Sequence, residues 1–180
     1  MNNLWPRRLC RQTTYRPNVT STPDAFNAED LTIRQADRAD LLAVFRIEKA
    51  VFSQPWPFAS FEQFLGNPGF LVAVQDGAVV GYAIADVTKS QGRDLGHLKD
   101  IAVHPQAQGE GVGRALVQRV LVSMAVAGAN VIKLEVRDSN DVAQSLYEDV
   151  GFERVRRVPA YYDDGEDAYV MVLDIEDWRN

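Results

Sequence analysis

The sequence predicts one mixed α/β domain, in which a central sheet is flanked by helices. The chain has 180 residues, about the size of a single domain. Its composition, 46% hydrophobic and 24% charged residues, is ordinary for a globular protein with one core. From residue 31 onward, apolar residues recur with the periods of strands and of helices in turn. We therefore expect a disordered tail over residues 1–30 and one folded domain over residues 31–180.

The first half of this domain is expected to place a capped helix between short strands. Asp37 can cap a helix whose apolar residues recur at helical spacing, until the prolines at positions 55 and 57 prevent it from continuing. Ser60 and Gln63 have the spacing of a capping box, which predicts a brief second helix. Asp76-Gly77 is a strong hairpin signal. In order, we expect a strand at 31–34, a helix reaching Phe52, a short helix ending before Pro68, and hairpin strands at 70–75 and 78–87.

In the second half, strands and helices alternate before a final pair of strands. A polar loop at 90–94 precedes an apolar strand, and Gly128 is placed to end the helix that follows. Asn140, between Ser139 and Asp141, is placed to cap a second helix. In order, we expect a strand at 95–103, a glycine-rich turn, a helix with Val112, Leu116, Val120 and Met124 on one side, a strand at 131–137, a short helix ending at Gly151-Phe152, and strands near 153–158 and 168–173.

Charge and composition exclude several classes of function. The net charge of −6 is unsuited to binding nucleic acid through its phosphates, which needs a basic surface. A lone cysteine, Cys10, allows neither an internal disulfide framework nor a cysteine-based metal cluster. No apolar run approaches the roughly 20 residues of a membrane span. We expect no nucleic-acid or membrane partner and no metal.

The first twenty residues are basic and contain no acidic residue. This composition fits a disordered tail, and it also resembles that of a transit peptide. Because no apolar secretory stretch follows, a cytoplasmic location is the default expectation. We also expect a monomer. The arginines of this segment are Arg7, Arg8, Arg11 and Arg16.

A glycine-rich turn, Gln108 to Gly113, lies between an expected strand and an amphipathic helix. Unpaired N–H groups at a helix N-terminus suit phosphate oxygens, and glycines let those oxygens approach. A P-loop is excluded because Arg114 and Ala115 follow Gly113, and a dinucleotide fingerprint counted from Gly109 meets Arg114 at its third glycine. The turn fully matches Q/R-x-x-G-x-G/A, the pattern of an acetyl-CoA pyrophosphate turn. A tight connection without ligand remains an alternative.

Several further segments appear in a fixed order with this turn. They are HLKDIAVHP at 97–105, QGEGVG at 108–113, LEVRDSN at 134–140, Leu146-Tyr147, Gly151-Phe152, Tyr161-Tyr162 and GEDAYVM at 165–171. Over residues 31–175 the chain resembles the GCN5-related N-acetyltransferase (GNAT) superfamily. Within it, the chain is similar to the ribosomal-protein-alanine (RimI) and archaeal N-terminal acetyltransferase branch.

This resemblance implies a mixed, mostly antiparallel sheet, splayed in the middle and flanked by helices in three layers. It also implies direct transfer of an acetyl group from acetyl-CoA to the N-terminal α-amino group of proteins, with ribosomal proteins as candidate acceptors. Gln108 stands where many relatives carry arginine. Glu110 must point away from a bound pyrophosphate.

The resemblance assigns the general base to Glu135 and the general acid to Tyr147. In the expected strand, Glu135 lies on the face opposite the apolar residues. The pattern alone favours a solvated charge for Glu135, and Tyr147 could equally be a core residue. An amine acceptor near neutral pH needs a base, and the departing thiolate needs a proton.

The same resemblance implies a set of cofactor contacts. Val103 N–H would stabilise the negative charge that develops on the thioester carbonyl. Asn140 would lie near the pantetheine arm while also capping its helix. The implied contacts are Ile101, Ala102, Val103, Gln108, Gly109, Glu110, Gly111, Val112, Gly113, Arg114, Asn140 and Tyr147.

Two aromatic loop segments are the candidates for acceptor binding. By resemblance, Phe52, Pro55 and Trp56 in one loop, with Tyr161 and Tyr162 in another, hold the first residues of a peptide. Aromatic residues in loops are also often core residues under the loop. The acids of the second loop, at positions 163, 164, 166 and 167, either attract a cationic acceptor or are ordinary solvated charges.

Two rival functions stay open at this point. The same fold acetylates small-molecule amines or lysine side chains, or binds acetyl-CoA without turnover. His97 and His104 lack the partners of a triad or a metal site in the sequence, so we expect both to be structural.

Overall fold

The computed structural model describes residues 31–179, and the tail expected over residues 1–30 lies outside them. Seven strands form one sheet in the order β1-β2-β3-β4-β5-β7-β6. Every neighbouring pair is antiparallel except β4–β5. No helix of the described part is long and apolar enough to cross a membrane. The strands are β1 Thr32–Gln35, β2 Phe70–Gln75, β3 Ala78–Thr88, β4 Leu95–Val103, β5 Val131–Arg137, β6 Glu153–Val158 and β7 Ala168–Asp174.

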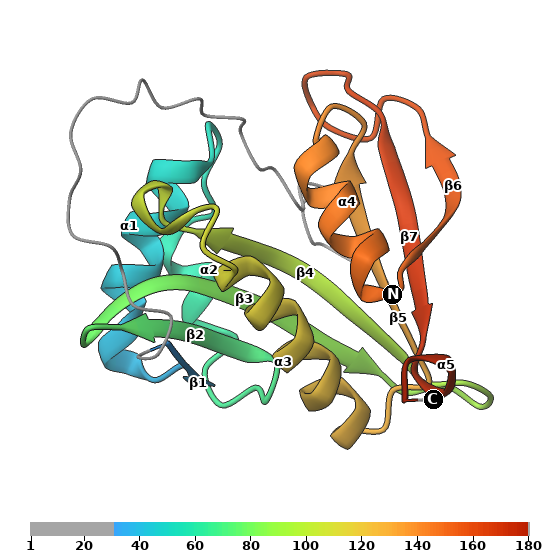
Figure 1. Cartoon of the computed structure of the whole chain (residues 1–180), viewed down its shortest axis with the longest axis horizontal. Helices are drawn as coiled ribbons and strands as arrows, with labels where there is room; N and C mark the ends of the chain where they lie inside the picture. The colour runs from blue at the N-terminus through green and yellow to red at the C-terminus, as the bar shows by residue number, and fades with distance from the viewer. Residues whose placement is uncertain (1–30, 180) are drawn as a thin grey trace.

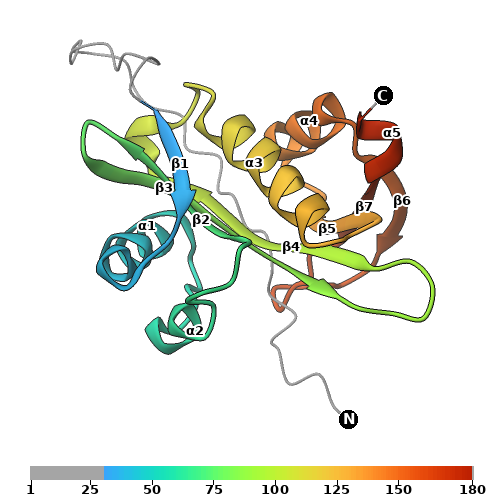
Figure 2. The same cartoon turned by 90° about the horizontal axis from the view of Figure 1, so that it is seen from below.

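The helices cover both faces of the sheet, which confirms the three-layer architecture (Figures 1 and 2). One apolar cluster lies between the sheet and α1 with α2, and a second lies between the sheet and α3 with α4. Side chains alternate between these faces along each strand. The helices are α1 Leu41–Val51, α2 Phe58–Glu62, α3 Val112–Val126, α4 Asp141–Val150 and α5 Ile175–Arg179.

The sheet splays between β4 and β5. These parallel strands pair only where Leu95–His97 face 131–133, and beyond that point they separate. Gly96 lies in this short paired segment, where an added Cβ would lie 2.9 Å from Cγ1 of Ile132. Glycine therefore allows the two strands to meet closely at the vertex, and beyond it the strands diverge (Figure 1). We call the unpaired interval between them the opening.

Most expected elements are observed. The strand over 131–137 has the expected bounds, and Asp76 and Gly77 have φ values of 51° and 75°, as a two-residue hairpin turn requires. The helix ending at Gly151 is also observed, with that residue at φ 111°.

Three details of the expected elements were wrong. Asp37 caps a 3₁₀ turn over Arg38–Asp40 that leads into α1, and the capping box is formed by Asp37 and Asp40. Ser60 lies inside α2 because that helix already begins at Phe58, so it caps nothing. The terminal helix α5 was not expected from the sequence.

Candidate functional site

The glycine-rich turn brings the N-terminus of α3 to a pocket of about 230 Å³. Gly109 and Gly111 have φ values of 85° and 84°, and an added Cβ at either would meet nothing within 4 Å. Glycine is therefore required here for its backbone conformation. The pocket is lined by Val103, Ala107, Gln108, Gly109, Gly111, Gly113, Arg114, Val142 and Leu146.

Not every residue assigned to the turn offers its side chain to the pocket. Gln108 Nε2 donates to the carbonyl of Val103, 2.9 Å away, and this bond ties the turn to the end of β4. Val112, the first residue of α3, is buried in the cluster between that helix and the sheet, and Glu110 is exposed and does not line the pocket. Arg114 is exposed and pairs with Asp149 at 2.7 Å.

The end of β4 directs backbone groups into the opening of the sheet. His104 N–H donates to the carbonyl of Val80 on β3, at 2.8 Å. Since backbone N–H groups point alternately to the two edges of a strand, those of Val103 and Ile101 point away from β3, toward the gap before β5. Ala102 instead faces β3 with its backbone, and its side chain packs in the α1 cluster.

Asn140 leaves one buried donor unpaired beside this opening. Its Oδ1 accepts the N–H of Ala143 at 3.1 Å, so it caps α4 as expected. The residue is 2% exposed, and its Nδ2 finds no partner among the described residues. A buried amide without a partner is unfavourable, so this group is suited to a ligand that carries a hydrogen-bond acceptor.

Glu135 lies in a buried ion-pair cluster on the face of β5 that α3 and α4 do not cover. Its Oε2 is 2.6 Å from Nε2 of His97 on β4, and its Oε1 accepts from Nζ of Lys133 at 2.8 Å. Leu134 and Val136, its neighbours in the strand, face the α3 side. Glu135 is therefore not the solvated charge that the pattern allowed, because its side chain is only 6% exposed.

The charges around Glu135 keep it ionised. Burial raises the pKa of the carboxyl, but the hydrogen bond and charge of His97, and then those of Lys133, outweigh burial and lower the pKa to about 2. A carboxylate with this pKa is a weak base. Its two oxygens are held by two partners, so the group is suited to orienting the imidazole of His97.

Tyr147 lies on the opposite side of the sheet from Glu135. It is fully buried in the α3–α4 cluster, with its ring edge-on to Phe152 at 5.8 Å. The two side chains assigned to acid and base therefore flank the opening between β4 and β5 from different faces. Molecules that react with both must meet within that opening.

The first acceptor loop is less exposed than the sequence suggested. Phe52 and Trp56 are each 7% exposed, and Trp56 stacks on Phe64 at 6.0 Å, so both belong to the α1 cluster. The loop passes over the core, so these aromatic rings pack into it. Phe52 still lines a pocket of about 430 Å³ together with Gln108, and Pro55 is exposed.

The second acceptor loop is anchored by Arg137. Its guanidinium lies 4.0 Å from the ring centre of Tyr162, which is buried, whereas Tyr161 is half-buried and edge-on to Tyr162 at 5.1 Å. Arg137 also pairs with Asp164 at 2.8 Å and with Glu166. Tyr162 is thus a core residue under its loop, the alternative left open for these aromatics, and its part in acceptor binding stays a prediction.

Comparison with known proteins supports the same assignment. The model of the acetyltransferase (GNAT) family matches residues 41–152. The chain belongs to the GNAT family. It is 35% identical over 159 residues to an N-alpha-acetyltransferase of Sulfurisphaera tokodaii, covering 82% of this chain and 95% of that protein.

Solved structures with the GNAT fold agree. The ribosomal-protein-S18-alanine N-acetyltransferase of Escherichia coli superposes with a TM-score of 0.70 at 33% identity, covering 81% of this chain and 94% of that one. The Salmonella typhimurium protein yncA, solved with its cofactor acetyl-CoA, gives a TM-score of 0.68 at 25% identity, covering 81% and 94%. The RimI-like and archaeal branch expected from the sequence is thus confirmed.

The residues of this GNAT chain fit acetyl-CoA. The helix N-terminus and its two positive-φ glycines offer N–H groups to a pyrophosphate. The unpaired Nδ2 of Asn140 suits an amide carbonyl of a pantetheine arm, and the edge of β4 offers the N–H of Val103.

Sequence reasoning missed the partners of Glu135. His97 was taken as structural, yet it lies 2.6 Å from the carboxylate across the β4–β5 junction. The signal for Lys133 was its spacing of two residues from Glu135 on one strand, which places both on the same face. The register between β4 and β5, which brings His97 close, is not visible in a sequence.

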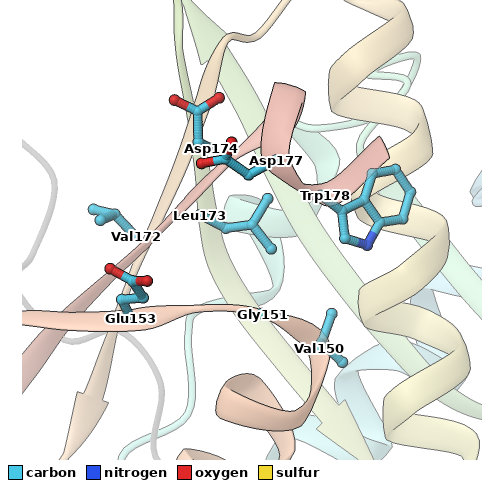
Figure 3. Close-up of a pocket in the computed structure, with 8 residues that line it drawn as sticks. All are labelled: Val150, Gly151, Glu153, Val172, Leu173, Asp174, Asp177 and Trp178. Carbon is cyan, nitrogen blue, oxygen red and sulfur yellow. The ribbon is translucent and has the colours of Figure 1, made fainter. Parts of the chain in front are cut away.

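A second pocket of about 430 Å³ lies away from this site in the GNAT chain (Figure 3). It sits at the end of β7 beneath α5, where β7 pairs with the start of β5, whereas the glycine turn lies at the N-terminus of α3. Carboxylates of Glu153, Asp174 and Asp177 and the indole of Trp178 line it. None of the residues assigned to transfer chemistry belongs to it.

Proposed function

We propose that this protein transfers the acetyl group of acetyl-CoA to the N-terminal α-amino group of proteins, including ribosomal proteins. The observation that carries the proposal is the opening between β4 and β5. It has the glycine turn at the N-terminus of α3 and Tyr147 on one face, and the His97–Glu135 pair on the other. Acetyl-CoA supplies an activated thioester when it is bound at the glycine turn.

In this proposal His97 accepts the proton of the acceptor amine, and Glu135 orients and stabilises the imidazole. The pKa of about 2 belongs to Glu135 beside a cationic His97, which is the state after proton transfer. Before transfer the imidazole is neutral, and the carboxylate at 2.6 Å stabilises the positive charge that His97 gains when it takes the proton. We therefore assign the role of base to His97 and Glu135 together, and not to Glu135 alone.

The remaining groups act on the thioester. The N–H of Val103 points into the opening, where it can stabilise negative charge on the carbonyl oxygen. Tyr147 is the proposed donor to the departing sulfur, since a phenol is a sufficiently weak acid to stay protonated until the thiolate forms. Asn140 holds the cofactor beside it.

The choice of acceptor rests on the relatives. The Escherichia coli structure is named for an alanine of ribosomal protein S18, and the Sulfurisphaera tokodaii relative is an N-alpha-acetyltransferase. The acidic loop contributes less than its composition suggested, because Asp164 and Glu166 are paired with Arg137. Transfer to lysine side chains, transfer to small amines and binding without turnover are the alternatives.

Mass spectrometry of peptides incubated with acetyl-CoA tests the proposal. Three matched peptides are compared. The first has a free N-terminus, the second has a blocked N-terminus and one lysine, and the third has both its N-terminus and its lysine blocked. We expect acetylation only of the first. Acetylation of the lysine peptide alone, or release of no CoA thiol with any peptide, would overturn the proposal.

Variants test the assigned roles. His97→Ala, Glu135→Gln and Tyr147→Phe should each lower kcat at least 100-fold, as loss of acid–base catalysis does. His104→Ala is the matched histidine control, since His104 only caps the 3₁₀ turn after β4 and should leave kcat close to the parent value. Equal losses from His97→Ala and His104→Ala would contradict the role of His97.

A further inference from the structure

Three polar side chains are buried together beneath the first acceptor loop, and the transfer chemistry uses none of them. Glu48 of α1, Tyr82 of β3 and Asp100 of β4 are 1%, 0% and 2% exposed. Two carboxyl groups so completely removed from water are costly unless they are hydrogen-bonded and share protons. They lie in the cluster that also contains Phe52 and Trp56.

The hydrogen bonds of this group fix how many protons it holds. The hydroxyl of Tyr82 lies within hydrogen-bond distance of an oxygen of Glu48 and, at 2.8 Å, of Oδ2 of Asp100. A phenol has one proton and can donate only once. The second contact therefore needs a proton on a carboxyl group. Two chains satisfy these contacts: protonated Asp100 donates to Tyr82 and Tyr82 to ionised Glu48, or the same bonds run in reverse from protonated Glu48 to ionised Asp100. The first chain leaves the charge on Glu48, whose other oxygen accepts a backbone N–H.

The end of this chain is attached to the acceptor loop. The second oxygen of Glu48, Oε1, accepts the backbone N–H of Trp56 at 2.6 Å. The carbonyl of Glu48 accepts the N–H of Phe52 at 2.9 Å, so the residue holds the loop at both ends. Phe52 lines the pocket beside Gln108 of the cofactor turn. A change in the hydrogen bonds of Glu48 thus reaches the acceptor side of the site.

We propose that Glu48 is a positioning residue for the acceptor. Its carboxylate holds the loop at Trp56, while Asp100, linked to it through Tyr82, carries the one proton that the two carboxyl groups share. The inference rests on the proposed function for its kinetic consequence, but its structural part stands alone. A charged acceptor forms a stronger hydrogen bond than a neutral one. The loop is therefore held more firmly when Glu48 is ionised.

The charged state of Glu48 changes near neutral pH. Burial raises the pKa of Glu48 to about 7, against the opposing hydrogen bonds of Tyr82 and Trp56. Burial and then the charge of Glu48 raise the pKa of Asp100 well above its usual range, and in the proposed chain the retained proton is on Asp100. The hold on the loop should strengthen as the pH rises through about 7.

No other charged group among the described residues faces Glu48 from the packed elements. Tyr82 faces it from β3 and Asp100 from β4, and the loop contributes the amide of Trp56. From α2, the ring of Phe61 packs on Tyr82 at 5.7 Å, while Glu62 pairs with Arg38 at the surface.

Two matched amide substitutions separate this proposal from a general loss of packing. Glu48→Gln removes the charge that holds Trp56, whereas Asp100→Asn keeps a donor toward Tyr82 and so imitates protonated Asp100. We expect Glu48→Gln to raise KM for the acceptor peptide about fivefold at pH 8.5 and hardly at all at pH 6, with kcat unchanged. Asp100→Asn should follow the parent protein at both pH values. The titration of the peptide amine is common to all three proteins and cancels from the ratios.

A spectroscopic measurement tests the same chain without catalysis. With ¹⁵N-tryptophan, only the amides of Trp5, Trp56 and Trp178 are labelled. The amide proton of Trp56 should move downfield as the pH rises through about 7 in the parent and in Asp100→Asn, and should not titrate in Glu48→Gln. A Trp56 amide that does not titrate in the parent, or equal KM effects of both substitutions, would overturn the proposal. If no variant turns over peptide while Trp56 titrates, the proposed function fails and the positioning chain stands.

Discussion

Replacing Glu135 by glutamine should reveal the ion-pair cluster as a pH-dependent contribution to stability. The native pKa of about 2 lies below the ordinary value of 4.5, which the unfolded chain should have. Ionised Glu135 therefore stabilises the fold above pH 4.5, and this contribution is lost as the pH falls toward 2. At roughly 1.4 kcal/mol per pKa unit, it amounts to about 3 kcal/mol at pH 7. At pH 3 about 1 kcal/mol remains.

Urea unfolding of the parent and of Glu135→Gln, measured from pH 3 to pH 8, checks this. The difference in the free energy of unfolding between the two proteins is the decisive quantity, because the titrations of all other carboxyl groups cancel from it. The side chain is 6% exposed, so solvent screens the cluster little. A difference that stays constant across this range, or grows as the pH falls, would refute the assignment of the ion pairs.

Two further changes have defined outcomes. Gly111→Ala should lower the free energy of unfolding of the ligand-free protein by about 1 kcal/mol, because φ is 84° there. Gly113→Ala, in the first turn of α3 and 3.5 Å from Leu146 Cδ2, should be neutral or stabilising by up to about 1 kcal/mol, and equal losses at both sites would contradict this account. Arg137→Met should lower the free energy of unfolding by about 2 kcal/mol in chemical denaturation, because Asp164 and Glu166 lose their partner. This loss should be smaller in 1 M salt. An unchanged denaturation midpoint would mean that the loop is anchored without Arg137.

The parts of the fold that could be predicted depend on local rules. The hairpin at Asp76-Gly77 follows from backbone preferences of two residues, and the strand over 131–137 follows from alternation along seven. The cap at Asn140 likewise needs only its own helix. Such features depend only on short stretches of sequence, so they could be predicted without knowledge of tertiary contacts.

What could not be predicted depends on partners distant in the chain. His97 and Glu135 meet only because β4 and β5 pair in one register over a few residues. Trp56 and Tyr162 could equally have been exposed recognition residues. Trp56 is instead buried against Phe61 of α2, and Tyr162 against Arg137. The roles of Glu135 and Tyr147 in transfer stay predictions, although the structure places them on two sides of one opening.

The close approach at Gly96 sets the point from which β4 and β5 diverge. The separation of the two strands further along therefore depends on this residue. A larger side chain at position 96 would press against Ile132 and displace both strands together. Gly96 is not among the residues assigned to a ligand, yet the interval in which acetyl-CoA and the acceptor are proposed to meet depends on it.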